Sequence, residues 1–128
     1  MQINIDVKAI EAKAIQIADR KCRTIAIKIQ AEARRMIHEG PKTGKIYMKG
    51  KNEDRPHQAS APGEAPATDT GNLARNINFV HIKDGHYRVI SSAEYSDLEF
   101  GRGRIKARPY MRPSAKKVAD ETGAKYSG

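Results

Sequence analysis

The residue types able to do chemistry are few and scattered in this sequence. The histidines are His38, His57, His81 and His86, and Cys22 is the only cysteine. None of them stands at the spacing that places two metal ligands on one helix face, and two histidines beside one hairpin turn would make only a weak site. We therefore expect surface histidines, no metal site and no cofactor.

One triplet is compatible with a catalytic role or with a local structural role. Residues 69–71 (DTG) match a motif of aspartic proteases, in which a buried apolar strand precedes the aspartate and two carboxylates share a proton. Here residues 64–68 (EAPAT) are no such strand, so we expect the aspartate or the threonine to cap a short helix through Leu73, Ala74 and Ile77. No nucleophile elbow, phosphate loop or dinucleotide fingerprint occurs, and we predict that the chain is not an enzyme.

The strongest feature is a basic stretch with aromatic residues, Tyr95–Ser114 (YSDLEFGRGRIKARPYMRPS). The chain has a net charge of +9, and Gly101–Lys117 alone carries seven cations and no anion. Such a local excess favours a polyanion or an acidic protein face as partner, bound in a salt-dependent way. The plainer alternative is a basic loop that joins two ordinary elements.

Within this stretch we expect two kinds of partner contact. The aromatic and apolar anchors are Tyr95, Leu98, Phe100, Tyr110 and Met111. The polar contacts are Arg102, Arg104, Lys106, Arg108 and Arg112. The neighbouring acidic residues are expected to pair with these cations or to stay solvated, and they are Glu94, Asp97 and Glu99.

The first element that must position these residues is a long helix, predicted from about Asp6 to His38. Asp6 can cap its start, and Gly40-Pro41 ends it. Apolar residues recur at three- and four-residue spacing at Ile15, Ala18, Cys22, Ile25, Ile29, Ala33 and Met36. A second stripe, rotated at the start, comprises Val7, Ile10, Ala14 and Ile17. Such stripes usually form core, but about 45 Å of helix exceeds what a small domain needs, so contact with a neighbouring subunit stays open.

The middle of the chain is predicted to be an irregular arm. Residues 40–68 hold many Gly, Pro and polar residues, and a loop of this length is either disordered or functional. We expect this arm to be mobile in the free protein. Lys45–Met48 is predicted to be a short strand or hairpin arm within it.

The remaining segment, 69–122, is predicted to hold a sheet, the basic loop and a final helix. Strands are expected at Asn76–Val80 and Tyr87–Ser91, because Asp84-Gly85 between them is a hairpin signal. Tyr95–Phe100 is compatible with either a short helix or a strand. The segment between Pro109 and Pro113 is expected to be extended. The final helix is predicted at Ala115–Glu121.

The length and composition limit the size of the core that the chain can form. The 128 residues suit one domain, 1–128, with helix over 1–39, and 38% hydrophobic residues with a mean hydropathy of −0.72 allow only a modest core. Parts of the chain are therefore expected to become ordered on assembly. No apolar run approaches the roughly 20 residues of a membrane span, and the start has no signal-peptide core.

Several stretches together resemble a known family. They are HQASAPGEAPA at 57–67, DTGNL at 69–73, EFG at 99–101 and ARPYMRP at 107–113. Their order and spacing are similar to those of head–tail joining, or tail-completion, proteins of long-tailed bacteriophages and prophages. The resemblance covers about His57 to Ala115, and the long N-terminal helix fits it. The chain departs from the family pattern in having Ser96, Arg102, Tyr110 and Met111 where the family often has Ala, Thr, Phe and Leu.

The resemblance implies an α+β fold with a helix packed on a small antiparallel sheet. The residue patterns described above identify that helix as the long N-terminal one and add a short C-terminal helix and a long irregular arm. It implies a virion protein without enzymatic activity that forms a ring, expected to be a hexamer, at the head-proximal end of the tail. Its partners would be copies of itself and neck, head-closure, tail-terminator or tail-tube proteins. The basic run could contact an acidic face of these proteins or line a channel crossed by DNA. A nucleic-acid-binding module using the same run is the alternative hypothesis.

Overall fold

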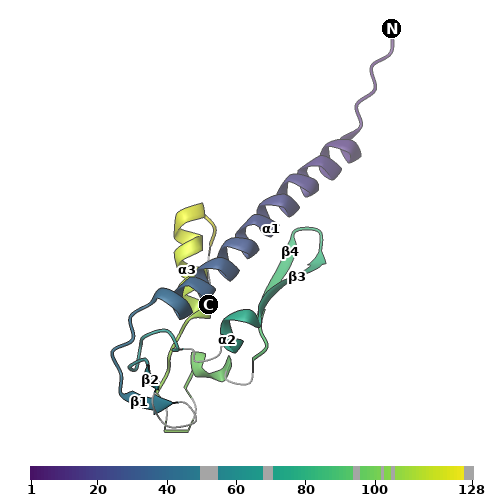
Figure 1. The fold of residues 1–128 in the computed structure, drawn as a ribbon. Helices are drawn as coiled ribbons and strands as arrows, with labels where there is room; N and C mark the ends of the chain where they lie inside the picture. Colours follow the sequence, from purple (N-terminus) through teal and green to yellow (C-terminus); the bar gives the residue numbers. More distant parts are fainter. Residues whose placement is uncertain (50–54, 68–70, 94–95, 102, 105, 126–128) are drawn as a thin grey trace.

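The architecture depends on one long helix, α1 (Val7–Glu39). The structure is a computed structural model, and it describes residues 1–49, 55–67, 71–93, 96–101, 103–104 and 106–125. α1 runs diagonally across Figure 1, and the other elements gather around its C-terminal half. The predicted caps are confirmed: Asp6 accepts a hydrogen bond from the Lys8 N–H at 2.9 Å, and the helix ends at Gly40.

Two separate two-stranded antiparallel sheets accompany this helix, where a single small sheet was expected. β1 (Ile46–Lys49) pairs with β2 (Arg55–Gln58), and β3 (Ile77–Lys83) pairs with β4 (His86–Ser91). The predicted strands of the second pair are confirmed, and β3 extends further than predicted. Gly85 in its turn has φ 76°, which glycine adopts without a steric cost.

The arm is more regular than its composition predicts. The short strand expected at Lys45–Met48 is confirmed by β1, but β2 lies in a segment that shows no apolar periodicity. Pro56 is tolerated in β2 because a two-stranded sheet has only edge strands, on which a missing N–H can face away from the partner.

Two short helical elements precede the C-terminal helix. α2 (Asn72–Arg75) confirms the short helix expected near Leu73, although Ile77 begins β3 and is not part of that helix. The capping roles predicted for Asp69 and Thr70 fall outside the described residues. The choice left open for Tyr95–Phe100 is decided for its described part by a 3-10 helix, η1 (Ser96–Glu99).

The C-terminal helix α3 (Met111–Thr122) begins four residues before the predicted start. The expectation of extended backbone between Pro109 and Pro113 is therefore wrong from Met111 onward. Pro113 lies in the first turn of α3, where its missing N–H costs nothing. The reason for the early start is tertiary, because the first N–H groups of α3 find an acceptor that lies 11 to 13 residues earlier in the chain, as described below.

The core lies where the C-terminal half of α1 meets α2, α3 and the β3–β4 hairpin. The core cluster consists of Ala33, Ile37, Ala65, Leu73, Ala74, Ile77, Ala93 and Tyr110. Hydrogen bonds from polar side chains of α1 also connect it to α2 and β3. Arg34 donates to the carbonyls of Ala74 and Ile77, and Gln30 donates to the Ile77 carbonyl. The fold is α+β, as predicted.

The two faces of the β3–β4 hairpin differ as the alternation of its residues predicts. Ile77 is buried and Phe79 is half-buried on the inner face, whereas Val80 and Ile82 are exposed on the outer face. On α1, the buried residues are Ala26, Ala33 and Ile37, all in the C-terminal half. The predicted core stripe is therefore covered only from about Cys22 onward, and Ile15 is exposed.

Candidate partner-contact site

The basic stretch is organised by a buried carboxylate. Glu99, at the end of η1, is buried, and its side chain accepts hydrogen bonds from three consecutive backbone N–H groups at the start of α3. The distances are 2.6 Å from Tyr110, 2.9 Å from Met111 and 2.8 Å from Arg112. The Nε atom of Arg112 donates to the same carboxylate at 3.0 Å. One negative group thus satisfies donors that a helix start leaves without intrahelical partners.

This arrangement also sets the ionisation of Glu99. Burial by itself would raise its pKa, but the N–H groups of Tyr110, Arg112 and Met111, together with the Arg112 guanidinium, outweigh that effect and lower the pKa below its ordinary value. The expectation that the acidic residues pair with nearby cations is confirmed for Glu99. The part that sequence reasoning missed is the set of backbone N–H partners, which no local motif signals.

Tyr110 was expected to contact a partner, and its position corrects that expectation. Its side chain is fully buried in the core, where its hydroxyl lies 2.7 Å from the Ser91 hydroxyl and 3.3 Å from the Ser96 carbonyl. Burial raises the pKa of this phenol. Tyr110 therefore links β4, η1 and α3 from inside the fold, and a partner cannot touch it in this conformation.

The other predicted anchors are distributed over two places. Phe100 is 72% exposed, with the Arg112 guanidinium carbon 4.6 Å from its ring centroid. Phe100, Met111 and Arg112 line an open cleft of about 360 Å³, and Met111 also packs against the core. Leu98 is half-buried and lines a different cleft, beside Tyr47 of β1. Tyr95 lies outside the described residues.

The cations of the basic stretch also separate into two groups. Arg108 binds Ser60 of the arm, with its Nε atom 3.0 Å from the Ser60 hydroxyl, and it also donates to the Lys106 carbonyl at 2.7 Å. Arg112 pairs with Glu99, as described above. Arg104 and the Lys106 side chain are exposed, and Arg102 lies outside the described residues. Two of the five expected polar contacts are thus already engaged within the chain.

A second polar cluster joins the tip of the β3–β4 hairpin to the middle of α1. Asp19 accepts from the Gly85 N–H at 2.9 Å and from the Tyr87 hydroxyl at 3.3 Å, and its carboxylate lies 3.4 Å from His81. Cys22 donates to the Gly85 carbonyl at 3.2 Å. Sequence reasoning missed this cluster because its members lie more than 60 residues apart and no motif connects them.

Asp19, His81 and Asp84 are the described residues with the best donor geometry for a metal ion. Their ligand atoms all lie within 4.8 Å of one another. His81 and Asp84 are exposed, however, and His81 is already in ion-pair range of both carboxylates. The contacts of His81 with the two carboxylates account for this geometry, so the three residues join the helix to the hairpin.

Comparison with protein-family models, with curated proteins and with solved structures found no match for this chain. Among the described residues, no helix has the length and apolar character needed to cross a membrane.

Proposed function

We propose that this chain is a structural virion protein of a long-tailed bacteriophage or prophage. Copies of it form a ring at the head-proximal end of the tail and join the tail to the head. It is made in the cytoplasm of the bacterial host and ends in the neck of the virion. Its partners are other copies of itself and proteins of the neck, head closure, tail terminator or tail tube, with DNA passing through the channel.

The observation that carries the proposal is that the stretches bearing the family resemblance are interlocked in space. The Gly63 N–H donates to the Ala107 carbonyl at 3.0 Å, and the Arg108 guanidinium binds Ser60. Glu99 in turn binds the start of α3 at residues 110–112. Segments more than 40 residues apart thus form one unit, which supports the view that the resemblance follows a real structural element.

The exposed part of this unit supplies the proposed contact with neck or tail proteins. Arg104 and Lys106 are exposed in the segment between η1 and α3, and Phe100, which precedes them in the chain, is the most exposed of the described aromatic side chains. An exposed aromatic ring and exposed cations in one short segment suit an acidic protein face with a small apolar centre. Arg108 and Arg112 tie the two ends of this segment to Ser60 and Glu99.

Charge reversal of the exposed pair tests the proposal. Arg104→Glu/Lys106→Glu is expected to leave the chain folded, because both side chains are exposed, but to leave filled heads and complete tails unjoined. Electron microscopy of lysates and the titre of infectious particles measure this outcome, and Lys125→Glu is the matched control at an exposed cation outside the loop. Normal particles from the double variant would remove the loop from the mechanism. Failure to detect the chain in purified virions by mass spectrometry would contradict the proposal as a whole.

Nucleic-acid binding by the same loop is the competing hypothesis. Internal pairing weakens it, because Arg108, Arg112 and Lys117 each have an acceptor within the chain. We expect weak, sequence-blind DNA binding that is lost between roughly 50 and 200 mM salt. Tight binding that survives the higher salt concentration would favour the nucleic-acid role.

A further inference from the structure

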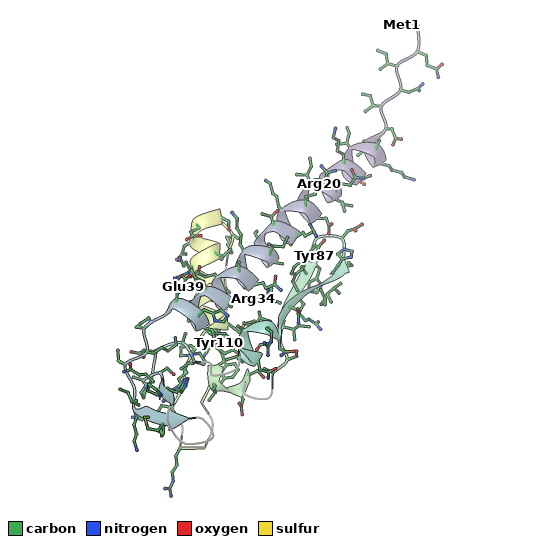
Figure 2. The ribbon with its side chains drawn as sticks, in the orientation of Figure 1. Met1, Arg20, Arg34, Glu39, Tyr87 and Tyr110 are labelled. Carbon is green, nitrogen blue, oxygen red and sulfur yellow. The ribbon has the colours of Figure 1, made fainter. Side chains whose placement is uncertain are left out.

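The N-terminal half of α1 carries an apolar surface that is exposed among the residues that the structure describes. Val7, Ile10, Ala14 and Ile17 recur at alternating spacings of three and four residues and so share one side of the helix, which we name the N-terminal stripe. Ile10 is 64% exposed and Ile17 is 49% exposed. In Figure 2 the side chains between Met1 and Arg20 surround a helix that extends beyond the rest of the fold. Regular apolar spacing on an exposed helix is typical of a face that packs against a partner.

A second uncovered apolar surface lies on the β3–β4 hairpin. Val80 and Ile90 are exposed on the side facing away from α1, and Arg88 stands directly across from Val80. Ile82 is exposed next to them, at the register irregularity between His81 and Lys83. We name these four residues the outer hairpin face. A two-stranded sheet is marginal in water unless a helix or another strand packs on it, and among the described residues α1 packs on the inner face of this one.

The two surfaces match in length and in charge. The N-terminal stripe spans about 15 Å at 1.5 Å per residue, and β3 from Asn78 to Ile82 spans about 13 Å at 3.3 Å per residue. Glu11 borders the stripe, because it follows Val7 by four residues. Arg88 stands within the outer hairpin face, where its stem adds apolar surface and its guanidinium can pair with a carboxylate.

We propose that the N-terminal stripe of one copy packs on the outer hairpin face of a second copy, with Glu11 paired to Arg88 across the contact. The stripe cannot reach the outer face of its own hairpin, because α1 already occupies the inner face. The contact joins two different surfaces and therefore propagates from copy to copy, closing into a ring if the rotation allows. In such an assembly, each β3–β4 hairpin lies between α1 of its own chain and α1 of a neighbouring copy.

This inference rests on the proposed function only in its premise that copies assemble, and its test needs the purified chain alone. The helix variant is Ile10→Asp/Ile17→Asp, and the hairpin variant is Val80→Glu/Ile82→Glu. A glutamate at position 80 stands across from Arg88, so the hairpin variant keeps a favourable cross-strand pair and its fold. Circular dichroism confirms folding, and light scattering after size exclusion measures mass.

We expect the wild type to form species larger than a monomer and each variant alone to be monomeric. Mixing the two variants in equal amounts should restore one intact contact per pair and yield dimers that grow no further. Variants that still associate alone, a mixture that stays monomeric, or a wild type that is monomeric up to the highest soluble concentration would each overturn the contact. Normal association of the purified chain, together with its absence from purified virions, would instead contradict only the proposed function.

Charge exchange provides an independent check that leaves the apolar residues unchanged. Glu11→Arg and Arg88→Glu are each expected to weaken association on the order of tenfold, and the combined variant should recover most of the loss. Lys8→Glu is the control, because Lys8 is an exposed charge on the same helix half that lies about 100° around the helix from the edge of the stripe. Additive losses in the combined variant would show that Glu11 and Arg88 do not meet.

Discussion

The two halves of α1 have similar apolar residues in opposite environments. In the C-terminal half, Ala33 and Ile37 are buried beneath α3 and the elements around β3 and β4. In the N-terminal half, Ile10 and Ile17 are exposed beyond the tip of the hairpin. The difference shows that an apolar stripe in the sequence predicts a surface that is buried by packing. The stripe does not predict whether another element of the same chain or a second molecule packs against it. In this chain α3 and the hairpin end before the helix does.

The largest effect is expected in the covered half. Ile37→Ala should lower the free energy of unfolding by about 2 to 5 kcal/mol, because it removes buried methyl groups and leaves a cavity in the core cluster. Chemical denaturation of the two proteins measures the difference. Ile27→Ala, at an exposed position on the same helix, is the control and should cost far less. Equal losses at the two positions would contradict the assigned core.

Loss of the Glu99 carboxylate should rank second. Glu99→Gln is expected to cost roughly 2 kcal/mol, because three backbone N–H groups and a guanidinium lose their charged acceptor. The stability of the variant is measured by thermal or denaturant unfolding. Asp120→Asn, which removes an exposed carboxylate from α3, is the matched control.

The ionisation of Glu99 gives that prediction a pH signature. Since the folded pKa lies below its ordinary value, the contribution to stability is present above the unfolded pKa and is lost as the pH falls through the folded one. Part of the acid sensitivity of the wild type should therefore be missing in Glu99→Gln. An unchanged acid profile in that variant would mean that the buried carboxylate is not what holds the start of α3.

A second pH effect is expected where α3 meets the covered half of α1, and it should be the smaller one because both cationic partners of Glu32 are exposed and screened by solvent. Glu32 lies 3.0 Å from Lys117 and also pairs with Arg35, and the Arg35 hydrogen bond is the main reason that its pKa falls from 4.5 to about 2. Its stabilising contribution should be present above about pH 4.5 and lost as the pH falls toward 2. Glu32→Gln should flatten this part of the profile. Unfolding midpoints of the wild type and of Glu32→Gln, measured over that pH range, test this prediction.

The smallest effect on the single chain is expected in the uncovered half. Ile10→Ala should change the stability of the monomer by no more than about 0.5 kcal/mol, because the side chain is 64% exposed and therefore removes little apolar surface from water. The measurement requires a concentration at which the chain is monomeric. A cost as large as that of Ile37→Ala would show that the chain itself covers this half of the helix.

Local patterns predicted most elements of the fold. The caps and span of α1, the β3–β4 hairpin and the alternation of its faces follow from the spacing of nearby residues, which the sequence displays directly. The early start of α3 could not be predicted, because its N–H groups are satisfied by Glu99. β2 was missed because pairing with β1, and not its own composition, makes it a strand.

The candidate site was predicted less well than the fold. Charge counting located the basic stretch, but it could not tell that Arg108 and Arg112 serve the fold while Arg104 remains exposed. Tyr110 is of a residue type that often anchors a partner contact, but its side chain is buried in the core. A side chain's type sets which interactions it can make, and long-range packing decides which of them it makes.

By itself, the sequence determined where the chain forms helix and hairpin, which face of each is apolar, and where positive charge concentrates, because those properties depend on neighbours a few residues away. Only the tertiary structure decided which apolar face is covered, which cation is free and that one carboxylate holds the start of the last helix. Those outcomes depend on segments that meet from far apart in the chain, such as Asp19 with Gly85 and Ser60 with Arg108. No short stretch of sequence contains both members of such a pair.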